Sequence, residues 1–381
     1  MSVASRRAEW MAVILSLFCI LQAFAGSDWV MHRGNPSLNG VAEVSAPGVP
    51  RQVWCFQAGK AIEGGAAIAG GRVFVGDGGG VLHALDLKSG RELWSFKTEG
   101  AVAATPLVHG TRVIVGSSDG KLYSIDAESG GLGWSYETGD KIMAGANVIN
   151  SPEGDSTWIL VGSYDANLHC VDAVTGKAVW KVETENYING TPALLPGGEV
   201  IFGGCDALLR VVSVVDGKPL RQIEAEAYVA SSVAVADDGK AYVGHYGNVV
   251  LGMDPKEGKV LWRYRDRNFP YLSSAAVTRN RVVIGGNDKR IHCMNRADGK
   301  PLWQFLTRGK VDGSPVICGD TVVVGSMDGR LYCVGLEDGS ERWVYELGSP
   351  VTGSPAVIEG WIVLGAEDGS VHGLQTNAAK P

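Results

Sequence analysis

No motif of a common enzyme active site in this sequence supports a catalytic assignment. The sequence contains no H-E-x-x-H zinc helix and no Walker A phosphate loop, and no G-x-S-x-G or paired-carboxylate signature that supports a catalytic assignment. A C-x-x-C motif and adjacent cysteines are also missing, so no disulfide pairing follows from the cysteine spacing. We therefore predict no catalytic, cofactor-binding or metal-binding residues.

An excess of positive charge is also lacking. The chain has 34 lysines and arginines against 41 aspartates and glutamates, which gives a formal net charge of −7. Nucleic-acid binding depends on neutralising phosphates, so we do not expect nucleic acid as a partner.

Long apolar runs are missing except at the N-terminus. Residues 11–24 are apolar, Arg6 and Arg7 precede them, and Ala23-Phe24-Ala25 has the form of a cleavage site. This arrangement is typical of a secretory signal peptide over residues 1–25. We therefore expect an exported protein, periplasmic or associated with the outer membrane, with no membrane span in the mature chain.

The export route stays open. An uncleaved membrane anchor is the alternative, although the apolar segment of about 14 residues is shorter than the roughly 20 that a span needs. Ser5-Arg6-Arg7 resembles a twin-arginine signal, but Glu9 stands where that signal has an apolar residue. The residues before Cys19 make a poor lipidation box.

A pattern with a period of about 40 residues runs along nearly the whole chain. It has the form D-G-x-L-[YH]-x-[IV]-D-x-x-[ST]-G-x-x-x-W, and residues 119–134 are one clear copy. Subtraction gives spacings of 40, 40, 46, 41, 41, 41 and 40 between successive copies of the last position, which we call the anchor. The anchors are Trp54, Trp94, Trp134, Trp180, Arg221, Trp262, Trp303 and Trp343. A fixed period of this length indicates a repeat architecture.

Each repeat contains four short strands. In residues 313–347, apolar and β-branched runs are separated by turns such as Gly319-Asp320 and Asp328-Gly329, and no stretch has helical periodicity. Four antiparallel strands repeated radially form a β-propeller blade. We predict an all-β, eight-bladed β-propeller.

The two ends of the repeat region complete each other. The last third-strand motif, residues 368–375, has no tryptophan strand after it, and the first tryptophan strand, residues 51–57, has no strands before it. We predict that this N-terminal strand is the outer strand of the last blade, which would leave no dangling edge. The expected organisation is a signal peptide (1–25), a lead segment (26–50), the propeller (51–375) and a C-terminal tail (376–381).

Cysteine and histidine occupy repeat positions. Cys170, Cys293 and Cys333 share one position with small residues, which favours buried free thiols, although an exported protein permits disulfides. Four histidines share another position with Tyr123 and Tyr332, and we interpret them as repeat structure instead of a metal site. They are His83, His169, His292 and His372.

The run [LIV]-[DN]-x-x-[ST]-G-x-x-x-W resembles the pyrroloquinoline-quinone (PQQ) repeat, as in residues 85–94 and 171–180. The lead segment, from Asp28 to Gly40, looks like the opening of exported bacterial PQQ-like propellers. The resemblance covers residues 51–375 and implies two possible functions. One branch of the family is non-catalytic scaffolds, such as the propeller subunit of the outer-membrane β-barrel assembly machinery. The other branch is dehydrogenases that hold PQQ and calcium on the axis.

The nearly constant spacing between anchors leaves little sequence for the insertions between blades that would build an active site, so we favour the scaffold branch. We expect a monomer that binds envelope proteins and no cofactor. The alternative is a small PQQ-dependent quinoprotein oxidoreductase with calcium, in which Glu63, Asn189 and Asp312 would be the candidate ligands.

Residues that break the repeat indicate where a partner could bind. The link after the sixth anchor, residues 265–271, is one residue longer than its counterparts and is aromatic and basic. Interface centres favour aromatic residues and arginine. The candidate partner-binding face consists of Tyr187, Tyr228, Arg265, Arg267, Phe269 and Tyr271. The alternative is that Phe269 and Tyr271 pack the junction between blades.

Overall fold

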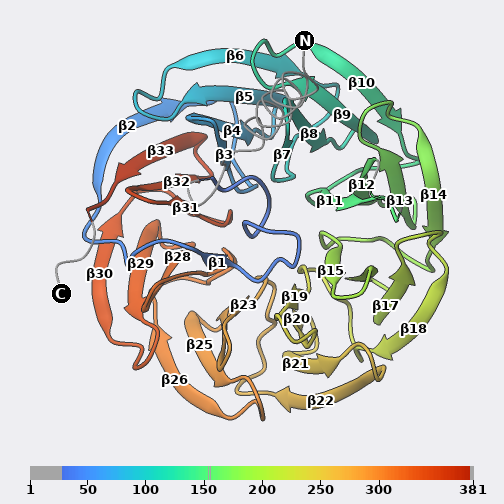
Figure 1. Cartoon of the computed structure of the whole chain (residues 1–381). Helices are drawn as coiled ribbons and strands as arrows, with labels where there is room; N and C mark the ends of the chain where they lie inside the picture. The colour runs from blue at the N-terminus through green and yellow to red at the C-terminus, as the bar shows by residue number, and fades with distance from the viewer. Residues whose placement is uncertain (1–27, 153, 155, 378–381) are drawn as a thin grey trace, which may run out of the picture.

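Eight antiparallel sheets surround a central axis in the computed structural model, which describes residues 28–152, 154 and 156–377 (Figure 1). These residues form 33 strands and no helix, so no helix in this part of the chain could cross a membrane. Seven sheets have four strands and one has five. The prediction of an all-β, eight-bladed propeller is confirmed.

The strands follow one another from the axis to the rim in every blade. Blades 1 to 4 are β3 (Ala67–Ala69), β4 (Arg72–Gly76), β5 (Val81–Asp86), β6 (Glu92–Lys97); β7 (Leu107–His109), β8 (Arg112–Gly116), β9 (Lys121–Asp126), β10 (Leu132–Glu137); β11 (Asn147–Asn150), β12 (Thr157–Gly162), β13 (Asn167–Asp172), β14 (Ala178–Glu183); and β15 (Ala193–Leu195), β16 (Glu199–Gly203), β17 (Leu208–Ser213), β18 (Pro219–Glu224). Blades 5 to 8 are β19 (Ala234–Val235), β20 (Ala241–His245), β21 (Val249–Asp254), β22 (Lys259–Tyr264); β23 (Ala276–Val277), β24 (Arg281–Gly286), β25 (Arg290–Asn295), β26 (Pro301–Leu306); β27 (Val316–Cys318), β28 (Thr321–Gly325), β29 (Arg330–Gly335), β30 (Glu341–Glu346); and β31 (Ala356–Ile358), β32 (Trp361–Gly365), β33 (Ser370–Gln375), β2 (Arg51–Gln57). The remaining strand, β1 (Val41–Ala42), pairs in parallel with β27.

The ring closes as the sequence predicts. Strand β2 pairs antiparallel with β33, in the register Trp54 to Gly373, and is the outermost strand of blade 8. Trp54 is 7% exposed, like Trp262 and Trp343 in complete blades. The first and last strands of the propeller therefore share one sheet.

Anchor side chains join each blade to the next. The indole N–H of Trp54 donates a hydrogen bond of 2.7 Å to the carbonyl of Leu87 in blade 1. Trp94, Trp134, Trp180, Trp262 and Trp303 donate in the same way to carbonyls of the following blade. Arg221, which replaces the tryptophan in blade 4, keeps this bond, because its Nε donates to the carbonyl of Pro255 at 2.7 Å.

Glycine is required where each indole meets the next blade. Gly90 has a φ of +69°, and a Cβ added there would lie 2.5 Å from the indole of Trp54. Any larger residue would both strain the backbone and displace the indole. The glycine of the [ST]-G pair in the repeat is therefore a packing partner of the anchor before it.

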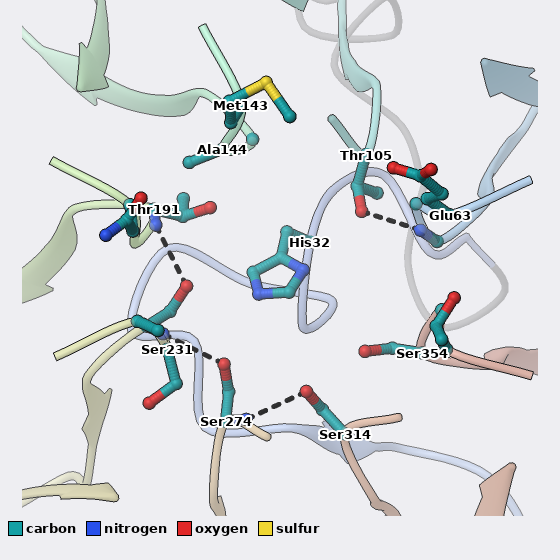
Figure 2. A pocket seen from close by; sticks show the side chains of 18 of the residues that line it. His32, Glu63, Thr105, Met143, Ala144, Thr191, Ser231, Ser274, Ser314 and Ser354 are labelled. Carbon is teal, nitrogen blue, oxygen red and sulfur yellow. Dashed lines mark hydrogen bonds between the residues drawn. The ribbon is translucent and has the colours of Figure 1, made fainter. Parts of the chain in front are cut away.

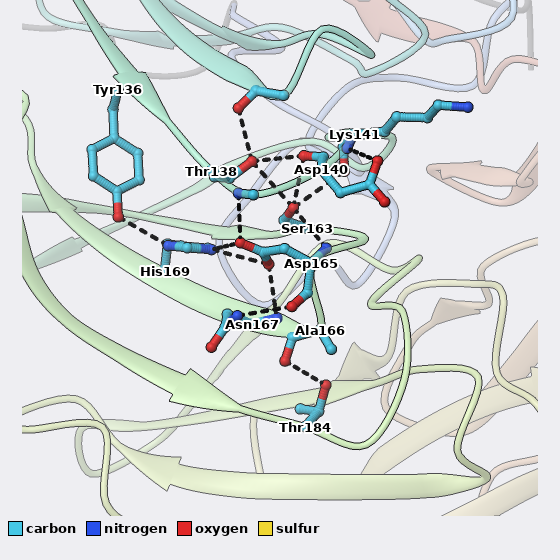
Figure 3. A network of polar contacts seen from close by, with 12 residues as sticks. Tyr136, Thr138, Asp140, Lys141, Ser163, Asp165, Ala166, Asn167, His169 and Thr184 are labelled. Carbon is cyan, nitrogen blue, oxygen red and sulfur yellow. Dashed lines mark hydrogen bonds and ion pairs between the residues drawn. The ribbon is translucent and has the colours of Figure 1, made fainter.

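Buried polar pairs hold the turn between the second and third strands (Figure 3). Asp165 accepts hydrogen bonds from the backbone N–H groups of Gly139 and Asn167 and lies 3.0 Å from Nε2 of His169. The other nitrogen of His169 lies 2.9 Å from the hydroxyl of Tyr136. Tyr123 and Tyr332 make the corresponding contact with Asp119 and Asp328. The shared His and Tyr position is therefore structural.

The six cysteines of the described residues are free thiols. Cys170, Cys293 and Cys333 are at most 1% exposed on the third strands, and burial raises the pKa of each thiol. This confirms the prediction of buried free thiols for the shared position. The predicted signal peptide and Cys19 lie outside the described residues.

The lead segment crosses the centre of the ring, which the sequence does not predict (Figure 1). Trp29 pairs with Ile68 at the inner edge of blade 1. Further along, carbonyls of the segment accept hydrogen bonds from the innermost strands of five other blades, with the pairs Val30–Val108, Pro36–Leu194, Ser37–Val235, Asn39–Val277 and Gly40–Ile317. Because these edge N–H groups are buried, the segment satisfies donors that would otherwise destabilise the fold.

The lead segment also completes the ring of anchors. In blade 8 the third strand, β33, is not followed by the [ST]-G turn of the other repeats, and the indole of Trp343 in blade 7 donates instead to the carbonyl of Pro47 at 2.9 Å. The segment therefore packs within the propeller and bonds to its blades.

Ring closure predicts equal costs for two substitutions. Truncating a buried aromatic residue to alanine typically costs about 3–5 kcal/mol. Trp54→Ala and Trp262→Ala remove side chains that are both 7% exposed and donate equivalent bonds. We expect equal losses in urea unfolding. A neutral Trp54→Ala would contradict the role of β2 in closing the ring.

Candidate functional site

The links between blades build one face of the disc around the axis. Eight residues after seven of the anchors, the link buries an apolar side chain, and all seven are at most 1% exposed: Ile62, Val102, Ile142, Ile188, Val229, Val311 and Val351. Backbone hydrogen bonds then join each link to the turn between the second and third strands, as in Cys205 to Tyr187 and Tyr246 to Tyr228. We call this surface the link face. The buried apolar side chains and the backbone hydrogen bonds to the turns together hold the backbone of this face in place.

A small cavity of about 160 Å³ opens at the centre of the link face. His32 of the lead segment projects into it on the axis, with hydroxyl groups around it (Figure 2). Glu63, Asn189 and Thr352 also line this cavity from three different links. The sequence analysis misses His32, because no repeat position indicates that the lead segment reaches the axis.

Six of the buried hydroxyl residues that line the cavity come one from each of six blades. We call them the hydroxyl crown: Thr105, Thr191, Ser232, Ser274, Ser314 and Ser354. Several crown oxygens accept a hydrogen bond from a backbone N–H of the preceding blade, at distances of 2.9–3.0 Å (Figure 2). Among the residues that the structure describes, no crown hydroxyl has an acceptor for its own hydrogen.

Two titratable groups of the lead segment lie on the axis. Burial, together with the positive charge of Arg33, lowers the pKa of His32 to about 3, so His32 is neutral at pH 7. Arg33 is 0% exposed, and burial lowers the pKa of its guanidinium to about 9, which leaves it charged. Its Nη2 donates to the carbonyls of Ala275 at 2.9 Å and Pro315 at 2.6 Å.

Arg33 fixes the path of the lead segment. Gly40 has a φ of +67°, and a Cβ there would lie 1.7 Å from the guanidinium. Only glycine lets the backbone pass this closely. Arg33 and Gly40 are therefore required together.

The residues of the cavity do not fit PQQ with calcium. Pockets for ligands of that size usually enclose about 300–1,000 Å³, and His32 occupies the axis of this smaller cavity. Glu63 and Asn189 line the cavity, but Asp312 does not, and no tryptophan lines it for stacking. Calcium requires six to eight oxygen ligands, and the three candidate residues do not form such a cluster.

One group of described residues has ligand atoms close enough for a metal, namely Asp266, Asp288 and His292. Asp288 and His292 form the repeated turn pair, with 3.0 Å between Oδ1 and Nε2. Arg267 and Arg290 lie within 4.0 Å of the Asp288 carboxylate. These two positive charges oppose a cation, so we interpret this group as structural.

The structure separates the predicted partner-face residues into two groups. Tyr187, Tyr228 and Phe269 are 46%, 56% and 48% exposed on the link face, and Arg265 and Arg267 are also exposed. Tyr271 is 2% exposed and its ring centroid lies 5.2 Å from that of His292. Tyr271 therefore packs in the blade junction, as the alternative interpretation states, whereas Phe269 does not.

Two tyrosines that the sequence analysis misses extend this surface. Tyr246 is 51% exposed, and Tyr164 stacks on Tyr187 with 4.6 Å between ring centroids and an angle of 9°. Burial raises the pKa of Tyr164, and the nearby Cys205, Tyr246 and Tyr187 raise it further. Tyr164 and Tyr246 both lie in turns between second and third strands. The only feature of the sequence that could have indicated them is an aromatic residue at a position where the repeat has none.

We call the exposed set the aromatic arc: Tyr187, Tyr228, Tyr246 and Phe269. In the part of the chain that the structure describes, these are the aromatic side chains with the largest exposure, and all four lie on the link face of neighbouring blades. The other large exposed apolar side chains are valines and leucines, mostly on outer strands.

Fold and face together define a PQQ-like propeller whose channel is filled by its own lead segment. The family model described as outer membrane protein assembly factor BamB matches residues 41–153, 145–287, 204–353 and 287–380. The chain therefore belongs to this family. No curated protein sequence matches the chain.

Solved structures of both branches share the fold. BamB from Moraxella catarrhalis is 19% identical, with a TM-score of 0.69 over 86% of this chain and 100% of that one. Quinohemoprotein alcohol dehydrogenase ADHIIG from Pseudomonas putida HK5 is 14% identical, with a TM-score of 0.78 over 93% and 81%. A europium-containing methanol dehydrogenase is 15% identical, with a TM-score of 0.74 over 89% and 90%. At these identities the likeness establishes the fold alone.

The neutral state of His32 predicts a pH dependence of stability. Its pKa is about 3 when folded and 6.5 ordinarily, so the unfolded chain binds a proton that the folded chain does not. Stability therefore falls as the pH decreases from 6.5, with a cost of about 2 kcal/mol at pH 5. We expect His32→Gln to remove this part of the slope in urea unfolding at pH 4–7. Parallel slopes for the two proteins would contradict the assignment.

Proposed function

We propose that this protein is a non-catalytic, exported scaffold that binds proteins of the cell envelope, with outer-membrane protein assembly as the process it serves. The observation that carries the proposal is the aromatic arc on a backbone that links and turns hold rigid. The match to the BamB family model supports the envelope location and the assembly role. A monomer is expected in isolation.

The partner binds, in this proposal, across the link face between Tyr187 and Phe269. Exposed tyrosine and phenylalanine side chains supply apolar area at a low cost in conformational entropy, and neighbouring arginines add directional hydrogen bonds. Arg267 is 52% exposed and only loosely paired, with 3.5 Å between its Nε and Asp266. Arg265 donates to the carbonyl of Gly247 and is held against the turn of blade 5.

A double substitution tests the partner face. Arg267→Glu with Phe269→Ala reverses one charge and removes one aromatic ring, so we expect loss or strong weakening of envelope-protein capture from detergent extracts. Both side chains are about half exposed, so the melting temperature should change little. Leu302→Ala, which changes a 43% exposed residue on an outer strand, is the matched control. Unchanged capture by the double variant would exclude this face.

The dehydrogenase alternative has its own test. The cavity chemistry predicts no stoichiometric PQQ binding at micromolar concentration with calcium present. Absorbance titration with PQQ and Ca²⁺, followed by dye-linked oxidation of alcohols and glucose, measures both binding and turnover. Saturable binding with calcium-dependent turnover would replace the scaffold proposal with the oxidoreductase and make Glu63, Asn189 and Asp312 the ligands to substitute first.

A further inference from the structure

We propose that the cavity on the axis is a binding site for a small oxyanion, such as a carboxylate or phosphate, which the hydroxyl crown holds above the buried charge of Arg33. This site is separate from the aromatic arc and does not depend on the partner that the arc binds.

Arg33 carries a buried positive charge without a negative partner. Its guanidinium is fully buried, and its polar contacts are two backbone carbonyls. Its Nε and Nη1 have no hydrogen-bond partner among the described residues. Buried charges are usually paired, because transfer of an unpaired ion from water is costly. An anion bound on the axis would supply the missing negative charge.

The hydroxyl crown lies next to this charge. The carbonyls that Arg33 contacts belong to Ala275 and Pro315, and the residues directly before them are the crown members Ser274 and Ser314. Since the Oγ atoms of these serines already accept backbone N–H groups, their own hydrogens remain to be donated. Several converging O–H donors suit a ligand rich in acceptor oxygens.

His32 adds a donor on the axis. Its neutral imidazole carries one N–H, and an anion beside it would favour its protonated form. Anion binding should therefore raise the pKa of His32. The charged groups near it are Arg33, which is the next residue in the chain, and Glu63, which also lines the cavity.

Size and charge limit the ligand. A cavity of about 160 Å³ admits an ion as small as acetate or phosphate. Glu63 is the carboxylate that lines it, and its side chain is exposed, so solvent and salt screen its repulsion. The buried Arg33 is screened much less, and its attraction should prevail at the crown.

Calorimetric titration of the full chain with sodium phosphate, and separately with sodium acetate, at constant ionic strength and pH 6.5 tests the proposal. We expect saturable binding of one ion per chain. The variant Ser274→Ala with Ser314→Ala should weaken it at least about a hundredfold, which corresponds to the loss of two donors to a charged ligand. This variant keeps Arg33, so it tests the site without removing the buried contacts of the lead segment.

Two controls separate the site from other effects. Ser124→Ala removes a buried serine hydroxyl that has no partner and lies on β9, away from the cavity, and should leave anion binding unchanged. Arg267→Glu with Phe269→Ala should also leave it unchanged, which distinguishes this site from the partner face.

Histidine NMR gives a second readout. The pKa of His32 should rise when phosphate saturates the site, whereas His109 should not respond. No saturable binding of either anion, or equal binding by the Ser274→Ala, Ser314→Ala variant, would overturn the proposal. A His32 pKa that stays unchanged in saturating phosphate would place the anion elsewhere and would overturn it as well.

Discussion

Hydrogen bonds and ring contacts between the anchor of one blade and the last turn of the next hold the propeller together, and the rest of the architecture follows from them. Every anchor indole except that of Trp343 donates to a carbonyl of the next blade and packs against a glycine there, as Trp54 does with Leu87 and Gly90. One blade cannot bury its faces alone, so stability requires that every such junction is made. Arg221 shows that the constraint is the donated bond, because an arginine Nε provides it as well as an indole does.

A closed ring creates a second constraint at its centre. The innermost strands of all blades turn one edge toward the axis, and their N–H groups need acceptors there. The lead segment supplies carbonyl acceptors to six of the eight blades, and Arg33 bonds to two of them. The lead segment thereby leaves a small cavity around His32 at the axis. The lead segment therefore stabilises the fold and also sets the size and the lining of the cavity in which a ligand could bind.

The sequence predicted those parts of the fold that the repeat encodes. Blade number, strand order, closure by residues 51–57 and the structural role of the histidines all follow from positions that recur every 40 residues or so. The lead segment could not be predicted in this way, because its contacts are backbone hydrogen bonds to distant strands and leave no periodic signal. For the candidate partner face, the sequence did not indicate which of its aromatic residues are exposed. Tyr271 and Phe269 lie in one link, and only the tertiary structure shows that Tyr271 packs against Gly244 and His292 while Phe269 faces solvent.

The aromatic arc and the axial cavity both lie on the link face, but different parts of the chain hold their residues in position. Links and turns fix the arc, so substitutions of its exposed side chains should affect binding without affecting the fold. The cavity instead depends on a charged residue from outside the repeat, and removing Arg33 would break two of the hydrogen bonds that hold the lead segment to blades 6 and 7. Because the crown serines are the part of the cavity that can change without this cost, selection could alter the anion site while the ring stays closed. Ser274 and Ser314 could therefore vary while Arg33 and Gly40 are kept. Such variation would change anion binding at the axis and leave the fold unchanged.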